Sequence, residues 1–318
     1  MRGTPWLSWL NTAELLLQVS SGLALYLSKQ MQQEYFARAM EQRVAINADR
    51  LSYAQDGEGE PVVFVHGSNA DHRVWDAHRD LIAPHYRMIR LTMRYFGTGA
   101  WPDDGENFSI QVLADDLAEF IRSLKLEPVT LVGWSLGAGV CLTMAVQHPR
   151  LVKRMFLYEP ALATFVSDEE KAQEALNDRV TMSEKARILA EAENLEGTVQ
   201  QFVDDVNAQY GAFNGLPEDI RGMMVENARM LPLLFAGPPA PPVLSQDLQE
   251  LALPVAIALG AQSRTFYQIT TRAAHSLIPS SQLRVIENAR HLFPVQKPEE
   301  FCIAVLDYLK HDVPAETR

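Results

Sequence analysis

Residues 129–139 read VTLVGWSLGAG, and this stretch decides how the rest of the chain is interpreted. It begins as a β-branched, apolar run typical of a buried strand, breaks at a Gly-x-Ser-x-Gly pattern centred on Ser135, and continues with small and apolar residues of helical character. A strand-to-helix turn as tight as this leaves almost no room for side chains at positions 133 and 137, which explains the glycines there. It also raises the serine hydroxyl above the edge of the sheet. Such patterns also occur by chance in loops, but the flanking strand and helix favour a nucleophilic Ser135.

Strand-like runs alternate with amphipathic helical stretches on both sides of this turn. The predicted strands are residues 44–47, 51–54, 62–65, 88–93, 129–134, 154–158, 255–260 and 283–286. The predicted helices between and after them are residues 71–84, 109–125 (with Ser109 as N-cap), 136–147, 265–277 and 298–309. The first two strands alternate like an antiparallel pair, and the later rhythm predicts an α/β fold with a mostly parallel central sheet flanked by helices.

The alternation of strands and helices stops between residues 161 and 251, where helix follows helix. The predicted helices there are residues 168–193, 197–210, 218–230 and 244–251. We therefore expect an inserted helical cap at 161–251, and a core built from residues 44–160 and 252–318.

The N-terminal residues 1–43 form a separate segment, which we expect to be a helical extension. Residues 15–28 are uncharged and mostly apolar but fall short of the roughly 20 residues that span a bilayer. An amphipathic helix that packs on the body or on a partner is the first interpretation. Contact with a membrane surface and a processed signal are the alternatives.

The amino-acid composition indicates which binding partners and which cellular compartment to expect. The 318 residues are 47% hydrophobic and carry a formal net charge of −12, which argues against binding to nucleic acid. The two cysteines, Cys141 and Cys302, lie in apolar helical contexts without metal-ligand spacing, so we expect buried free thiols in a cytoplasmic protein. A small-molecule substrate is the expected partner, no metal or organic cofactor is called for, and homo-oligomerisation stays open.

The order of these features resembles the α/β-hydrolase fold superfamily, in particular its capped, esterase-like serine hydrolases. The features that carry the resemblance are His66-Gly67 after one strand, the Gly-x-Ser-x-Gly around Ser135 after another, and His291 after the last, and the likeness covers roughly residues 44–310. It implies that Ser135 is the nucleophile and that His291 is its base. The alternative is that His291 is an ordinary histidine of a surface loop, but its position in the chain order favours the catalytic role. It also implies that the backbone N–H groups of Ser68 and Leu136 form the oxyanion hole, and leaves His66 a structural role.

The acid is where the sequence departs from the common pattern of the family. An aspartate is expected after strand 255–260, but no Asp or Glu occurs between Val255 and Ile286. Either His291 works without a carboxylate or another strand supplies one. Glu159 directly follows strand 154–158, a position used for the acid by some members of the family, haloalkane dehalogenases among them. We therefore predict Glu159 as the acid, against the alternative of a solvated strand end.

These residues predict a serine hydrolase that cleaves an ester or related acyl bond of a small to medium hydrophobic substrate through an acyl-enzyme. Carbon–carbon bond hydrolysis, amide hydrolysis and acyl transfer or perhydrolysis use the same apparatus and stay open, as does a non-catalytic ligand-binding protein on this fold. The cap carries many large side chains, some of which must form its own core, the first interpretation for any single one. Together they suggest an apolar pocket beneath the cap: Phe165, Met182, Phe202, Tyr210, Phe213, Met223, Met224, Met230, Leu233, Leu234 and Phe235.

Overall fold

The computed structural model describes residues 41–310, except residue 48 and residues 238–242. The chain divides into two units at Gln42, and the unit that begins at Arg43 is described here. The predicted N-terminal helical extension, residues 1–43, lies almost wholly outside the described residues. Among the helices that are described, none combines the length and hydropathy needed to cross a bilayer.

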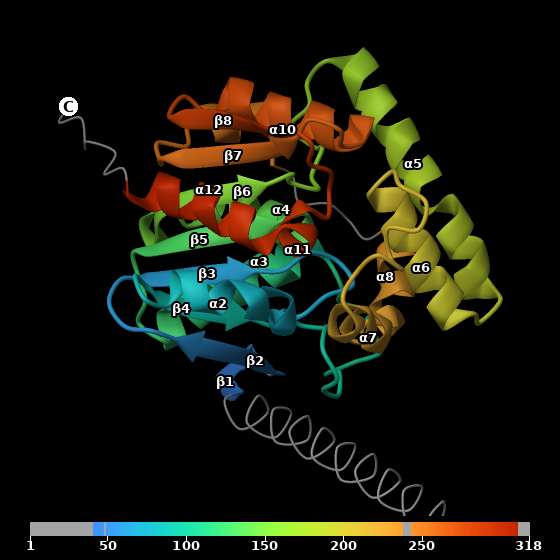
Figure 1. Ribbon diagram of the computed structural model, residues 1–318. Coiled ribbons are helices and arrows are strands. Elements are labelled where there is room, and N and C mark those ends of the chain that lie inside the picture. The colour runs from blue at the N-terminus through green and yellow to red at the C-terminus, as the bar shows by residue number, and fades with distance from the viewer. Residues whose placement is uncertain (1–40, 48, 238–242, 311–318) are drawn as a thin grey trace, which may run out of the picture. The chain divides into compact units, whose positions relative to one another are not determined.

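An eight-stranded sheet forms the centre of this unit (Figure 1). Its order is β1-β2-β4-β3-β5-β6-β7-β8. The strands are β1 (Gln42–Ile46), β2 (Asp49–Asp56), β3 (Pro61–Val65), β4 (Arg87–Leu91), β5 (Val129–Trp134), β6 (Val152–Tyr158), β7 (Val255–Gly260) and β8 (Ser281–Ile286). β2 pairs antiparallel with β4, and every pairing from β4 through β8 is parallel. The predicted fold class is confirmed.

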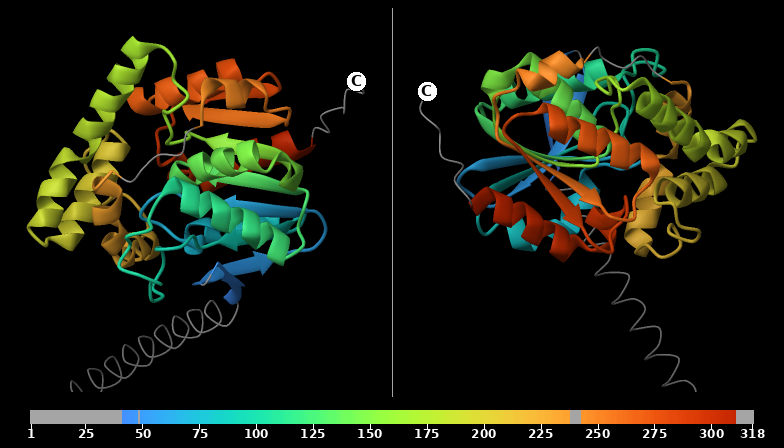
Figure 2. Two further views of the ribbon diagram at one scale, coloured as in Figure 1. Left: turned by 180° about the vertical axis from the view of Figure 1, so that it is seen from behind. Right: turned by 90° about the horizontal axis from the view of Figure 1, so that it is seen from above.

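Helices cover both faces of the sheet. α3 (Ile110–Ser123) and α4 (Leu136–Gln147) lie on one face, and α2 (Arg79–Ile82) and α12 (Pro298–Lys310) lie on the other (Figure 2). The strands β3, β5 and β7 are almost entirely buried, as expected for parallel strands between two helical layers. α3 begins as predicted, because the Ser109 hydroxyl accepts a hydrogen bond from the Val112 N–H at 3.2 Å.

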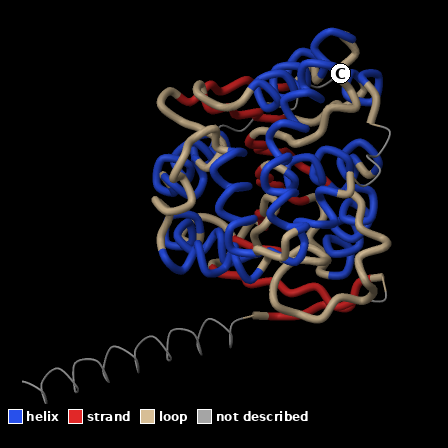
Figure 3. The backbone as a smooth tube through the Cα atoms, turned by 90° about the vertical axis from the view of Figure 1, so that its right-hand side faces the viewer, coloured by secondary structure: helices blue, strands red, loops and turns tan. Residues whose placement is uncertain are grey.

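A run of helices follows β6 and precedes β7. It consists of α5 (Glu169–Glu191), α6 (Leu195–Val206), α7 (Glu218–Glu226), a 3₁₀ turn η3 (Ala228–Met230), α8 (Leu231–Phe235) and α9 (Ser245–Gln249). We call residues 161–251 the helical insertion. It lies beside the carboxyl ends of the central strands (Figure 1), and the view from that side shows helices and loops in front of the strand ends (Figure 3). α10 (Thr265–Leu277) packs against α5.

Two predicted helices differ from those observed. Residues 71–84 form a 3₁₀ helix η1 (His72–His78) followed by the short α2, and Leu81 is left 37% exposed. The change from three to 3.6 residues per turn rotates the positions that follow. The predicted helix 218–230 breaks at Asn227, whose side-chain amide donates to the Asp71 carboxylate and whose Oδ1 accepts from the Gly97 N–H. Both of these partners are distant in sequence, so local propensity does not reveal the break.

Candidate active site

The turn after β5 has the tight geometry that its glycines predict. Ser135 has φ 55° and ψ −117°, a strained conformation for a residue with a side chain, and α4 begins at the next residue. A Cβ on Gly137 would lie 2.3 Å from the His66 carbonyl oxygen, and one on Gly133 would lie 2.7 Å from the Ala138 Cα. Neither position therefore accepts a side chain unless the backbone moves.

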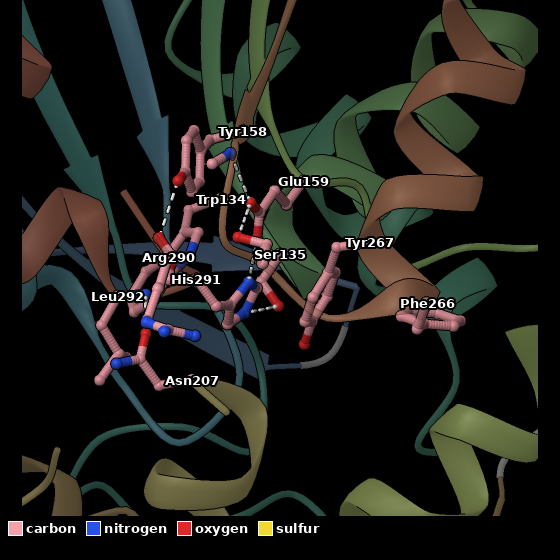
Figure 4. A network of polar contacts seen from close by, with 12 residues as sticks. Trp134, Ser135, Tyr158, Glu159, Asn207, Phe266, Tyr267, Arg290, His291 and Leu292 are labelled. Atoms are coloured by element: carbon pink, nitrogen blue, oxygen red, sulfur yellow. Dashed lines mark hydrogen bonds and ion pairs between the residues drawn. The ribbon is translucent and has the colours of Figure 1, made fainter. Parts of the chain in front are cut away.

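Ser135, His291 and Glu159 come together from three places in the chain (Figure 4). His291 lies in the loop between β8 and α11 (Phe293–Gln296), and Glu159 directly follows β6. The His291 Nε2 is 3.0 Å from the Ser135 Oγ, and its Nδ1 is 2.6 Å from the Glu159 Oε2. Ser135, His291 and Glu159 are 4%, 3% and 0% exposed, respectively, so the hydrogen-bonded chain is shielded from bulk water.

The Glu159 carboxylate is held from its other side by the end of β7. Its Oε1 accepts hydrogen bonds from the Gly260 N–H at 2.8 Å and from the Ser263 hydroxyl. Glu159 has a positive φ of 50°, and its own N–H donates to the Ala258 carbonyl at 3.1 Å. The segment that lacks the expected aspartate thus donates the hydrogen bonds that hold a glutamate from the neighbouring strand.

Further contacts fix the His291 loop. The Trp134 indole N–H donates to the His291 carbonyl at 3.0 Å, and the Tyr158 hydroxyl donates to the Arg290 carbonyl at 2.8 Å. From the helical insertion, the Asn207 Oδ1 accepts from the Leu292 N–H at 2.9 Å. The backbone on both sides of the imidazole is therefore anchored.

Tyr267, in the first turn of α10, stacks flat on the His291 ring (Figure 4). The ring centroids are 3.8 Å apart and the planes differ by 10°. Burial raises the pKa of the Tyr267 hydroxyl, and the negative charge of Glu159 acts in the same direction, so the phenol stays neutral. The sequence did not point to Tyr267, because nothing in the local pattern of α10 indicates which of its aromatic side chains faces the histidine.

His66 forms its hydrogen bonds with backbone groups, and burial lowers its pKa to about 4, so it is neutral near pH 7. Its Nε2 accepts from the Met93 N–H at 3.1 Å, and its Nδ1 is 2.8 Å from the Gly67 carbonyl, to which it donates. This arrangement matches the structural role expected for it. Ser68 and Leu136, the predicted oxyanion donors, both lie at the same cavity as Ser135, and Leu136 is the first residue of α4.

A cavity of about 340 Å³ opens above Ser135 and His291. The helical insertion contributes most of its apolar lining, including Met182, Phe202, Val206, Met224, Leu234 and Phe235. Of the other large side chains of the cap, Phe165, Phe213, Met223 and Met230 are buried and do not line the cavity, as expected for the cap's own core. Tyr210 is 94% exposed, so it belongs neither to the core of the insertion nor to the pocket, and the prediction is wrong for this residue.

Neither cysteine takes part in this site, and both are buried free thiols, as predicted. Within the described part of the chain, no three His, Cys, Asp or Glu side chains converge in a way that could hold a metal ion.

Comparison with known proteins agrees with the geometry. A family model described as the alpha/beta hydrolase fold matches residues 60–298. A Bacillus subtilis (strain 168) protein, provisionally named 2-succinyl-6-hydroxy-2,4-cyclohexadiene-1-carboxylate synthase, is 26% identical over 272 residues, which cover 82% of this chain and 96% of the relative. An Acinetobacter baylyi (E)-2-((N-methylformamido)methylene)succinate hydrolase is 35% identical over 103 residues, 32% of this chain and 38% of the relative.

Solved structures share the fold at lower identity. An esterase from Thermogutta terrifontis aligns with a TM-score of 0.64 and 23% identity, covering 85% of this chain and 97% of that one. A bacterial membrane phospholipase A aligns with a TM-score of 0.67 and 18% identity, covering 95% and 97%. The chain belongs to the α/β-hydrolase fold family, and its relatives there include hydrolases.

Proposed function

We propose that this member of the α/β-hydrolase family is a serine hydrolase that cleaves an ester or related acyl bond through an acyl-enzyme on Ser135. The observation that carries the proposal is the buried hydrogen-bonded chain from the Ser135 Oγ through His291 to Glu159, with distances of 3.0 and 2.6 Å. A serine hydroxyl is a weak nucleophile until an adjacent base accepts its proton, and this arrangement supplies that base.

The chemistry follows from the positions of the three side chains. The His291 Nε2 takes the Ser135 proton as Oγ attacks the acyl carbon, and then returns it to the leaving group as the acyl–oxygen bond breaks. Glu159 receives the Nδ1–H, which fixes the tautomer with a free Nε2 and stabilises the imidazolium while it exists. A water molecule, deprotonated by the same imidazole, then releases the acid and restores the serine.

The proposed oxyanion donors are the backbone N–H groups of Ser68 and Leu136. Leu136 begins α4, so its N–H has no carbonyl partner within the helix and points with the positive end of the helix dipole. Ser68 and Leu136 border the cavity beside Ser135. Loss of one such donor costs about 3 kcal/mol of transition-state stabilisation in comparable sites.

In this proposal the helical insertion acts as a cap that binds the hydrophobic part of the substrate. Its apolar side chains form one wall of the 340 Å³ cavity, and Ser135 and His291 border the same space. The volume suits a small to medium acyl or aromatic group. Carbon–carbon bond hydrolysis and acyl transfer would use the same residues. One of the two relatives is named a synthase and the other a hydrolase, so their names do not decide which reaction this chain catalyses.

Labelling with a fluorophosphonate tests the proposal. We expect stoichiometric modification, located on Ser135 by peptide mass spectrometry and abolished in Ser135→Ala, together with turnover of p-nitrophenyl esters from acetate to octanoate. A folded protein whose Ser135 stays unmodified and which hydrolyses none of these esters would instead be a ligand-binding member of the family.

A further inference from the structure

Arg179 places a positive charge at the wall of the otherwise largely apolar cavity. It lies on α5, and the cavity is lined by Leu176, Arg179, Val180 and Ser183, whose spacing of three and four residues puts them on one helical face. The Arg179 side chain is half-buried. Among the described residues that line the cavity, it is the one with a permanent charge, and none is an aspartate or glutamate.

Asp178, next to Arg179 in the sequence, and Glu159, in the candidate active site, are both hydrogen-bonded to other residues. Asp178, the adjacent residue, accepts two hydrogen bonds from the Arg264 guanidinium, at 2.5 and 3.2 Å, and one from the Phe266 N–H at 2.9 Å. Glu159 is bound to His291 and to the end of β7. Within the described parts of the chain, no ion pair neutralises the Arg179 guanidinium.

We propose that Arg179 binds a carboxylate of the substrate, so that the enzyme acts on hydrophobic esters or acyl compounds that carry a free acid group away from the scissile bond. This inference rests on the proposed function, because it uses the same cavity. A guanidinium presents a planar pair of N–H donors that match the two oxygens of a carboxylate, and such charge-assisted hydrogen bonds are stronger than those between neutral groups.

The charge count favours a carboxylate over a phosphate. A phosphate monoester carries between about −1.5 and −2 charges at pH 7, and a single arginine would leave much of that charge unbalanced. A carboxylate carries a single charge, which one guanidinium balances. The Ser183 hydroxyl, on the same face of α5, donates to the backbone carbonyls of Arg179 and Val180 at 3.3 Å, so Arg179 is the donor left for the anion.

Tyr267 relates this anion site to the reacting groups. Its ring stacks on His291, its hydroxyl lies 3.7 Å from the Met182 Sδ on α5, and the charge of Arg179 is near enough to oppose the burial that raises the pKa of that hydroxyl. Arg179, on α5, and Tyr267, on α10, line the same cavity as Ser135 and His291. A ligand that reaches both Ser135 and Arg179 would pass along this tyrosine.

Monomethyl and dimethyl suberate form a matched pair for the test, since they differ only in whether the far end is a carboxylate or a methyl ester. Calorimetry with Ser135→Ala measures their binding without hydrolysis, and methanol release by the protein with Ser135 intact measures kcat/KM. Arg179→Met keeps an unbranched apolar stem and removes the guanidinium, and Arg179→Lys keeps the charge without the paired N–H donors. The control is Arg187→Met, an exposed arginine on the same helix outside the cavity lining.

We expect Ser135→Ala to bind the monoester at least about tenfold more tightly than the diester, and kcat/KM to show the same preference. Arg179→Met should remove the preference, Arg179→Lys should retain part of it, and Arg187→Met should leave it unchanged. Equal binding of the two esters, or a preference that survives Arg179→Met, would overturn the assignment. Because the calorimetry does not depend on catalysis, it decides this point even if Ser135 proves unreactive, a result that would refute only the proposed hydrolase activity.

Discussion

Replacing Glu159 with glutamine tests the least expected member of the proposed triad. The substitution keeps the size of the side chain and removes its charge, so the buried packing around it should persist. The two sides of the carboxylate decide what the new amide can do. On one side, the Gly260 N–H donates to Oε1 at 2.8 Å, and on the other, Oε2 lies 2.6 Å from the His291 Nδ1.

The orientation of the amide follows from the fact that a backbone N–H can only donate. The side chain introduced by Glu159→Gln must turn its oxygen toward Gly260, so its NH₂ faces the Nδ1 of His291. Nδ1 then has to accept, and the proton of the neutral imidazole moves to Nε2, the nitrogen that faces Ser135. The base has lost its free electron pair at the serine. Trapping the wrong tautomer in a related triad lowers kcat about 10⁴-fold, which corresponds to about 5 kcal/mol in the activation barrier.

The assay is the steady-state hydrolysis of a p-nitrophenyl ester, with the rate of fluorophosphonate labelling of Ser135 as a second measure. Both should fall together in Glu159→Gln, while circular dichroism and the midpoint of urea unfolding confirm an intact fold. Glu159→Asp is the matched control, because it keeps the charge but shortens the side chain, and we expect it to retain more activity than the glutamine variant. Turnover by Glu159→Gln within tenfold of the parent protein would refute the reasoning and leave His291 working without a carboxylate.

Three further predictions concern the surroundings of the site. Tyr267→Leu should lower kcat by about fivefold while Tyr267→Phe stays near the parent value, because an aromatic face stabilises the imidazolium by about 1 kcal/mol. Gly137→Ala should reduce the free energy of unfolding by about 2 kcal/mol, since its Cβ would meet a carbonyl oxygen at 2.3 Å, whereas Gly99→Ala, with open space at that position, should not. The pKa of buried His66 and of buried His78 is about 4, against 6.5 in the unfolded chain, so the unfolded state binds more protons between these pH values. Urea unfolding should therefore show the free energy of unfolding falling by about 3 kcal/mol per histidine from pH 6.5 to 4. His78→Leu should remove the contribution of His78 to this pH dependence.

The parts of the fold that were predictable are those in which local chemistry and tertiary structure agree. The turn at Ser135 is specified by two glycines that no side chain could replace, and the N-cap at Ser109 by a hydroxyl that reaches the helix it starts. The break at Asn227 could not be predicted, because its causes are Asp71 and Gly97, more than 100 residues earlier. Long-range polar contacts of this kind leave no periodic signal in the sequence.

The candidate site also contains residues that the sequence could predict and residues that it could not. Ser135 and His291 could be located by chain order alone, because each follows a strand and the carboxyl ends of parallel strands meet at one edge of the sheet. Tyr267 and Arg179 could not, because each is one of several suitable residues on its helix. Which of them faces the cavity depends on how α10 and α5 pack together.

The position of the proposed acid, after β6 and not after β7, has a simple geometric basis. β6 and β7 are adjacent and in register, with Tyr158 opposite Ala258, so the residues that follow them lie at the same edge of the sheet, about 4.8 Å apart. A glutamate has one methylene more than an aspartate, and the positive φ of Glu159 redirects its side chain. Gly260 completes the arrangement: a Cβ there would lie 2.6 Å from the Ala289 carbonyl, so only glycine lets the His291 loop approach while its N–H binds the carboxylate. The absence of an aspartate after β7 is therefore matched by residues suited to hold the glutamate after β6, and the two features are best read together as one site.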